Sequence, residues 1–194
     1  MEMKTMRTCL ALACLSLVFS GSGCGSNATS GPLDATAFGA KYKIHDNSEM
    51  PGWKQDPDPN NKTPFKVYVG EDLVAEIDGA AQLYTDKGAR LSMYQYLVGS
   101  GLETCTVIAM DFVTDAKATD IFNYQKDSYG ASDPIPGFDT SVAIGSFALG
   151  NATVFAHFKA MYFELPLSGF PNGDQTLTYQ GAAQFLTALK AKTN

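Results

Sequence analysis

The residue best suited to chemistry is Cys24, whose thiol ends an amino-terminal stretch of unusual composition. Lys4 and Arg7 make its start basic, an apolar run follows from Cys9 to Phe19, and small residues then lead to the cysteine. This order is typical of a bacterial secretion signal, so we expect an export signal over residues 1–23. An uncleaved membrane span is disfavoured, because crossing a bilayer takes about 20 apolar residues.

The small residues before Cys24 resemble the signal of bacterial lipoproteins, in which the cysteine takes a diacylglycerol and becomes the first mature residue. Gly21 departs from that pattern, which usually has Leu three residues before the cysteine. Ordinary cleavage to a secreted product is therefore the alternative. Gly25, where an inner-membrane lipoprotein would have Asp, implies the outer membrane by the same resemblance. Because each buried methylene contributes about 0.8 kcal/mol, several acyl chains would anchor the protein firmly.

The charge balance limits the partners of the mature chain. The whole sequence has a net charge of −6, and loss of the signal removes two basic side chains and one acidic one, which leaves −7. Binding to nucleic acids depends on Lys and Arg at phosphates, so we expect no nucleic-acid partner. The expected partners are the membrane, through the lipid on Cys24, and a second protein of the envelope.

Cysteine and histidine are too scarce for the common catalytic and metal sites. Cys9 and Cys14 leave with the signal, so Cys105, in an apolar strand, is the remaining free thiol and is expected to be buried and inert. His45 is expected to be solvated and His157 to be structural or on the surface. The sequence has no HExxH, G-x-S-x-G or P-loop motif. We therefore expect no metal, no cofactor and no enzymatic activity.

Hydrophobic periodicity and turn residues predict an α+β domain with a mainly antiparallel sheet and about three helices. The expected helices cover residues 71–87, a segment capped by Thr114-Asp115 and a segment capped by Asp174 or Thr176. A hairpin is expected to turn at Gly150-Asn151, and Pro166 to end the last strand. The predicted strands are residues 65–69, 90–98, 104–113, 142–149, 152–158 and 161–165.

The remaining segments are predicted as tether and loops. Residues 24–44 are small and polar and are expected to form a flexible tether, which leaves residues 45–194 as a single domain. A turn at residues 50–53 presents Trp53, the one tryptophan of the chain. Residues 129–138 contain two prolines and are predicted to be loop.

One helical motif is a candidate for interaction or for packing. In Asp78-Gly79-Ala80-Ala81, a carboxylate stands beside a glycine in the middle of a predicted helix, and Tyr84 follows on the same face. The carboxylate could contact a partner, or the small residues could let the helix pack closely on the sheet. The second interpretation is favoured, and Tyr84 is expected in the core rather than in a ligand cage.

The chain resembles a family of uncharacterised secreted bacterial proteins and lipoproteins. The resemblance rests on the Pro51-Gly52-Trp53 opening and on residues 73–84, which are close to the family pattern L-x-x-Y-I-[DN]-G-A-A-x-x-Y. It covers about residues 50–190 and departs at Glu76, where the family has Tyr, and at Ala160, where Gly is common. It implies the fold and an envelope location, and it supplies no chemistry.

Three functions remain open. The first is an envelope lipoprotein whose domain binds or assembles with another protein without catalysis. The second is a binding module for a small apolar or glycan ligand, using aromatic residues around Trp53 and the loop at 129–138. The third and least favoured is an enzyme with dispersed carboxylates, for which Asp78 would be tested first.

Overall fold

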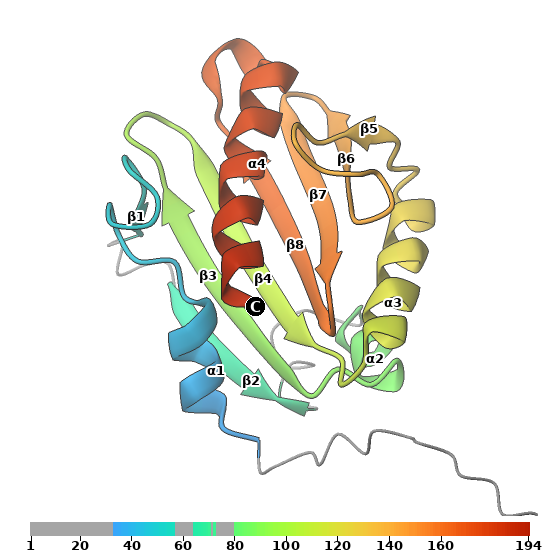
Figure 1. Ribbon diagram of the computed structural model, residues 1–194. Helices are drawn as coiled ribbons and strands as arrows, with labels where there is room; N and C mark the ends of the chain where they lie inside the picture. Colours follow the sequence, from blue (N-terminus) through green and yellow to red (C-terminus); the bar gives the residue numbers. More distant parts are fainter. Residues whose placement is uncertain (1–32, 57–63, 71, 73–79) are drawn as a thin grey trace, which may run out of the picture.

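An antiparallel sheet of eight strands forms the centre of the computed structural model, which describes residues 33–56, 64–70, 72 and 80–194 (Figure 1). The strands follow the order β1-β3-β4-β8-β7-β6-β5, and β2 also pairs with β3. Their bounds are Lys54–Gln55 (β1), Phe65–Val69 (β2), Leu91–Val98 (β3), Thr104–Asp111 (β4), Asp133–Pro134 (β5), Ala143–Ala148 (β6), Asn151–Phe158 (β7) and Met161–Ser168 (β8).

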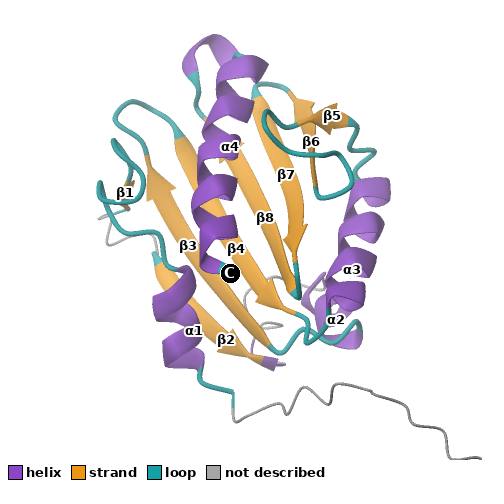
Figure 2. Ribbon diagram, in the orientation of Figure 1, coloured by secondary structure: helices purple, strands orange, loops and turns teal. Residues whose placement is uncertain are grey.

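Helices cover both faces of this sheet (Figure 2). We call the face under α1 and α4 the α4 face, and the face under α2 and α3 the α3 face. The expected α+β architecture is confirmed, with four α-helices in the described residues where about three were predicted. The helices are α1 (Ala35–Tyr42), α2 (Ala80–Asp86), α3 (Asp115–Ser128) and α4 (Gln175–Lys192), and the 3₁₀ turn η2 (Pro171–Gly173) leads into α4.

The period of two in the strands divides the apolar side chains between two cores. In β8, Phe163 and Leu165 face α4, while Tyr162 faces α3. The α4-face core is built from aliphatic and aromatic side chains around Phe185 of α4, which is 0% exposed. The α3-face core gathers Phe112, Phe122, Phe155 and Tyr162, all almost fully buried.

Local signals for the helix ends are confirmed. Thr114 caps α3 by accepting a hydrogen bond from the Lys117 backbone N–H at 3.3 Å, and Asp174 caps α4 by accepting from Leu177 N–H at 3.0 Å. Gly88 lies at φ +97° after the end of α2, as expected for a residue that ends a helix in the left-handed region. The predicted part of this helix at 71 and 73–79 lies outside the described residues.

The boundary of the tether was wrong. Residues 35–42, predicted as part of it, form α1, and Ile44 after the helix is 0% exposed. Asp34 caps α1 by accepting from Ala37 N–H, and Phe38 and Tyr42 pack one turn apart in the α4-face core. The folded domain therefore begins before residue 45.

The hairpin of β6 and β7 forms, but it turns one residue earlier than predicted. Leu149 and Gly150 make the turn, at φ +52° and +78°, and Ala148 pairs with Asn151. Each residue of β6 thus meets a partner two positions from the expected one. Because this shift is even, every side chain keeps its predicted face of the sheet.

Two further predictions in this half of the chain were wrong. Pro166 does not end β8, which continues to Ser168; instead, the β4–β8 pairing is interrupted opposite Pro166, where a proline has no N–H to donate. The predicted loop at residues 129–138 contains the short strand β5, which pairs Asp133 with Gly145 and extends the sheet by one edge strand.

Candidate functional site

A groove on the α4 face brings Trp53 to the side of α4. Residues 50–53 form a turn in which the Trp53 N–H donates to the Met50 carbonyl at 3.0 Å and Gly52 has φ +84°. Proline followed by a left-handed glycine suits a type II turn, so the predicted turn is confirmed with its physical reason. Trp53 is 8% exposed, packs edge-on against Phe185 at 4.8 Å between ring centroids, and lies 6.2 Å from Phe170.

Two clefts meet at this turn. The first, about 350 Å³, lies between the turn, the β3–β4 connection and the start of α4; the second, about 650 Å³, lies between Glu49–Pro51 and the middle of α4. Pro51 and Gln184 line both clefts. Because the two clefts adjoin at these residues and both lie along α4, we call the pair the α4 groove.

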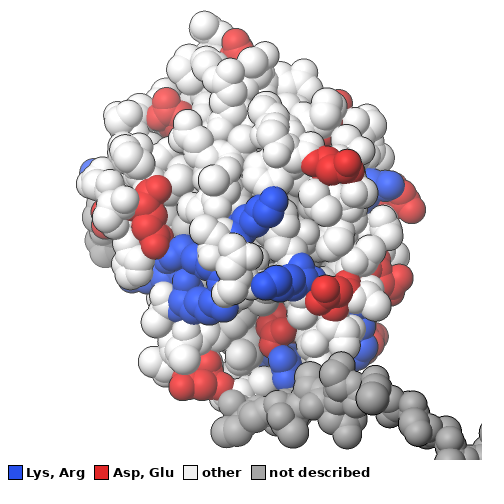
Figure 3. All heavy atoms as spheres, viewed as in Figure 1, with Lys and Arg blue, Asp and Glu red and all other residues white. Residues whose placement is uncertain are grey.

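The α4 groove has an apolar floor and an amide-bearing wall. Trp53, Phe170 and Met50 supply the floor. Gly181 lets the helix approach closely, because a Cβ there would lie 2.7 Å from the Phe170 ring. Figure 3 shows that the upper part of this face is mostly uncharged, whereas lysines gather lower, over α1 and the end of α4. The uncharged polar side chains along the wall and at the β3–β4 connection are Gln180, Gln184, Thr187 and Ser100.

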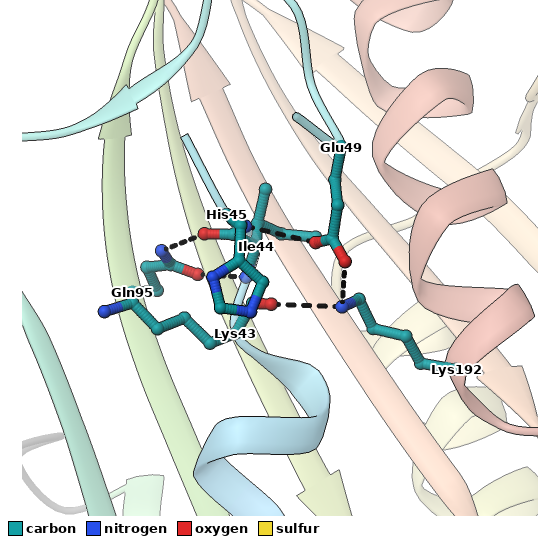
Figure 4. Close-up of polar contacts among 6 residues, drawn as sticks. All are labelled: Lys43, Ile44, His45, Glu49, Gln95 and Lys192. Carbon is teal, nitrogen blue, oxygen red and sulfur yellow. Dashed lines mark hydrogen bonds and ion pairs between the residues drawn. The ribbon is translucent and has the colours of Figure 1, made fainter. Parts of the chain in front are cut away.

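A buried amide holds the segment that forms the far wall of the groove. Gln95 of β3 is 0% exposed; its side-chain oxygen accepts from the Ile44 N–H, and its NH₂ donates to the Ile44 carbonyl, both at 2.8 Å (Figure 4). The amide thus satisfies both backbone groups of Ile44 as a neighbouring strand would. This contact fixes the start of the segment that leads to Trp53.

The end of α4 holds the same segment by charge. The Lys192 ammonium donates to Glu49 Oε1 at 2.7 Å and to the carbonyl of Lys43, the residue after α1, at 3.1 Å (Figure 4). Burial alone would raise the pKa of Glu49, but hydrogen bonds from Lys192 and from the His45 N–H outweigh it, and the net effect lowers that pKa. The cation also suits the negative end of α1.

The predicted site residues do not come together at one place. Cys24, Asp78 and Gly79 lie outside the described residues, and Ala80 is the first residue of α2. Ala81 and Tyr84 belong to the α3-face core, on the opposite side of the sheet from Trp53. The predicted ligand site is also divided, because Tyr129 packs on Phe155 of the α3 face at 5.0 Å.

Tyr84 is part of a buried polar network that the sequence analysis missed. Its hydroxyl donates to Glu164 Oε2 at 2.9 Å and accepts from Gln125 Nε2 at 2.6 Å, while Tyr162 donates to the same carboxylate oxygen at 3.2 Å. Burial raises the pKa of Glu164, and the two tyrosine hydrogen bonds offset only part of that rise. Tyr84 is thus a core residue, as expected, with a defined polar partner.

Of the scarce reactive residues in the described part of the chain, Cys105 is buried, His157 is packed against α3, and His45 lies at the surface. Cys105 is 0% exposed, and burial raises the pKa of its thiol well above the ordinary value, as expected for an inert cysteine. His45 is exposed. His157 lies against Phe122 and its Nε2 is 2.9 Å from the Ser141 carbonyl oxygen. Among the described residues no group of three His, Cys, Asp or Glu side chains could hold a metal ion.

The groove was only partly visible in the sequence. The Pro51-Gly52-Trp53 turn pointed to one wall, but Gln184 and Gly181 looked like ordinary positions of an amphipathic helix. Gln95 and Glu164 are polar residues inside largely apolar strands, and that interruption of the pattern is the one signal they leave.

The comparisons with known proteins leave the family open. No protein-family model and no curated protein matches the chain. One solved structure that it matches is the extracellular domain of PknH from Mycobacterium tuberculosis, at 11% identity and a TM-score of 0.45, over 82% of this chain and 92% of that chain. None of the helices in the described residues has the length and apolar character to cross a membrane.

Proposed function

We propose that this protein is a lipoprotein of the bacterial envelope, anchored through Cys24, whose domain binds an extended segment of a partner protein in the α4 groove without catalysis. The export signal and the cysteine at its end support the anchor, and Gly25 after the cysteine supports an outer-membrane location by resemblance to other lipoproteins. The groove supports the binding role. The resemblance to secreted proteins of unknown function is part of the same proposal.

The observation that carries the binding role is the extent of the two adjoining clefts along α4. Residues 177–188 line it, a distance of about 16 Å at 1.5 Å per residue. An extended peptide rises about 3.3 Å per residue, so the groove fits about five residues. Gln180 and Gln184 can each donate to and accept from a peptide backbone.

The polar groups of the groove suit binding better than proton transfer. Amides and hydroxyls hydrogen-bond without exchanging protons at neutral pH. The two acids on its rim are engaged, since Glu49 pairs with Lys192 and Glu103 accepts from the Gly101 N–H at 2.7 Å. A neutral partner segment is therefore the expected occupant, held by backbone hydrogen bonds and by apolar side chains against Trp53.

A glycan or small apolar ligand is the second candidate, and the cleft beside Trp53 favours it. An aromatic ring next to amide side chains suits sugars, which have apolar faces and hydroxyl edges. Trp53, Phe170 and Gln180 offer this combination within a cleft of about 350 Å³. Such a ligand would occupy the first cleft and leave Thr187 and Ala188 uncontacted.

The emission of Trp53 provides the test, because the chain has one tryptophan and it lines the groove. Peptides selected from a random library on the purified protein should change this emission and lose affinity at least tenfold in Gln184→Lys. The matched control is Asn123→Lys, an exposed substitution on α3, which should leave binding unchanged. A response to oligosaccharides alone would favour the second candidate; no response to either would overturn both.

The anchor is tested separately by intact mass. Protein extracted from its own membranes should carry a lipid-sized addition that is absent in Cys24→Ser. An unmodified mature mass would show a secreted protein without a lipid and would contradict this half of the proposal.

A further inference from the structure

Three leucines stand out at one end of the domain. Leu149 is 99% exposed and Leu102 is 86% exposed, the highest values among the large apolar side chains of the described residues, and Leu177 is 41% exposed. Burial of an apolar side chain normally stabilises the folded protein, so full exposure forgoes that stabilisation. Leu102 lies in the β3–β4 turn, Leu149 in the β6–β7 turn, and Leu177 in the first turn of α4.

These connections lie side by side. A side chain at Gly169, after β8, would collide with the Leu102 carbonyl, and one at Gly150 would lie 3.4 Å from Gly173. Thr104 pairs with Ser168 and Leu167 with Ala152, so β4 begins, β8 ends and β7 begins at the same end of the sheet. The turns therefore project from one end, the upper end in Figure 1. We call this surface, formed by Leu102, Leu149, Leu177 and their turns, the leucine end.

The backbone at Leu149 gives no folding reason for a leucine. Leu149 and Gly150 both have positive φ, the requirement of a type I′ hairpin turn, which favours Asn, Asp or Gly at these positions. Leucine there is conformationally unfavourable, and its side chain is almost fully in solvent. Neither stability nor turn geometry explains this residue.

The leucine end lacks the charges of an anion-binding surface. Residues 99–103, 149–151 and 169–177 contain Glu103 and Asp174 and neither Lys nor Arg. Both carboxylates accept backbone N–H groups, Glu103 from Gly101 and Asp174 from Leu177. Attraction to anionic headgroups is therefore not expected here.

We propose that the leucine end rests in the surface of a neutral phospholipid bilayer. A protein partner would need a hollow matched to each separate protrusion, whereas a fluid bilayer accepts single apolar side chains wherever they enter. The inference rests on the proposed anchor, whose tether joins the domain before α1, beside Met161 at the other end of β8. An extended tether would therefore have to run along the whole length of the sheet. Residues 24–33 reach about 35 Å when extended, while an eight-residue strand such as β8 is about 27 Å long.

This orientation brings the α4 groove to the membrane. Leu177 of the leucine end lines the cleft beside Trp53, together with Pro171 of the preceding turn η2. With the leucines in the bilayer surface, that cleft would open where the lipid headgroups meet water. The partner segment expected in the groove would then be one that emerges from the membrane or lies on it.

A fluorescent probe at Leu149 tests the contact. In the lipidated protein, Leu149→Cys can be labelled with an environment-sensitive dye, because Cys24 is acylated and Cys105 is buried. The protein is reconstituted into phosphatidylcholine vesicles with and without spin-labelled phosphatidylcholine, which quenches dyes in the bilayer. Val69→Cys is the control, since Val69 is 41% exposed and pairs with Leu91 at the opposite end of β3.

We expect several-fold stronger quenching at position 149 than at position 69, with little dependence on salt. Leu102→Glu, a substitution of an exposed side chain, should reduce the quenching at 149 without unfolding the domain. Equal quenching at both positions, stronger quenching at 69, or none at either would overturn the proposal. The intact mass of the same sample reports the lipid on Cys24, so loss of the anchor and failure of the leucine contact are distinguishable.

Discussion

The two faces of the sheet hold their carboxylates in opposite ways. On the α4 face, Glu49 lies at the surface and is paired with Lys192, and its pKa is lowered. On the α3 face, Glu164 is 8% exposed, has tyrosine and not a cation as its partner, and its pKa is raised. A carboxylate thus borders a surface groove on one face, and another is enclosed in the core on the other. This contrast is consistent with the binding role proposed for the α4 face and with a structural role for Glu164 on the α3 face.

The largest loss of stability is expected when a buried ring is removed from either core, and tryptophan emission should distinguish the two losses. Phe185→Ala and Phe112→Ala each remove a fully buried ring and should lower the free energy of unfolding by about 3–5 kcal/mol. Of these two residues, Phe185 is the one that contacts Trp53. Native-state tryptophan emission should therefore shift in Phe185→Ala and stay unchanged in Phe112→Ala. Urea unfolding with fluorescence measures both. A Trp53 shift in Phe112→Ala would show that the faces are coupled.

The next largest effect on stability is expected from the two hydrogen bonds between the Gln95 side chain and the Ile44 backbone. Gln95→Leu leaves the buried N–H and C=O of Ile44 without partners, which should cost about 1–3 kcal/mol. Because the segment to Trp53 starts there, ligand binding in the α4 groove should also weaken. The control is Gln82→Leu, which alters an exposed glutamine of α2 and should leave stability nearly unchanged. Wild-type stability in Gln95→Leu would contradict the role of these two hydrogen bonds.

Glu164 should make the domain less stable as pH rises. Its pKa is raised in the folded state, so its contribution to stability is fully present below the unfolded value of about 4.3 and is lost as pH rises through the folded pKa. Glu164→Gln removes this slope and keeps a side-chain oxygen for Tyr84 and Tyr162. Thermal unfolding of both proteins across this window measures the difference; parallel curves would contradict the assignment.

Glu49 should show the opposite sign and the smallest size. Its lowered pKa means that the Lys192 pair contributes above the unfolded pKa and is lost as pH falls through the folded one. The pair is partly exposed, so Glu49→Gln should cost about 0.2–1 kcal/mol at neutral pH and less at high salt. The same unfolding series measures it. A cost that persists at acidic pH would argue against the ion pair.

Most of the fold could be predicted because its signals are local. Alternation marked the long strands, and Thr114, Asp174 and Gly88 marked helix ends with side chains or backbone freedom suited to them. The error at α1 has a physical cause. The helix is short and its flanks are small and polar, and the spacing of Phe38 and Tyr42 by one turn was its one apolar signal.

The candidate site was harder to predict because it is assembled from distant segments. Gln95 and Ile44 are 51 residues apart, and Glu49 meets Lys192 across 143 residues. No local pattern encodes such pairings. Trp53 was recognised as unusual, but Gln184, which lines the same cleft, shares no motif with it and becomes significant only because α4 lies beside the turn.

Hydrogen exchange with and without a selected peptide tests the central claim most directly. If the α4 face is the binding face, exchange should slow at residues 49–53 and along residues 177–188, while α3 and the strand residues beneath it stay unchanged. Slowing confined to α3, or no slowing along α4 with the peptide bound, would contradict the assignment of binding to the α4 groove.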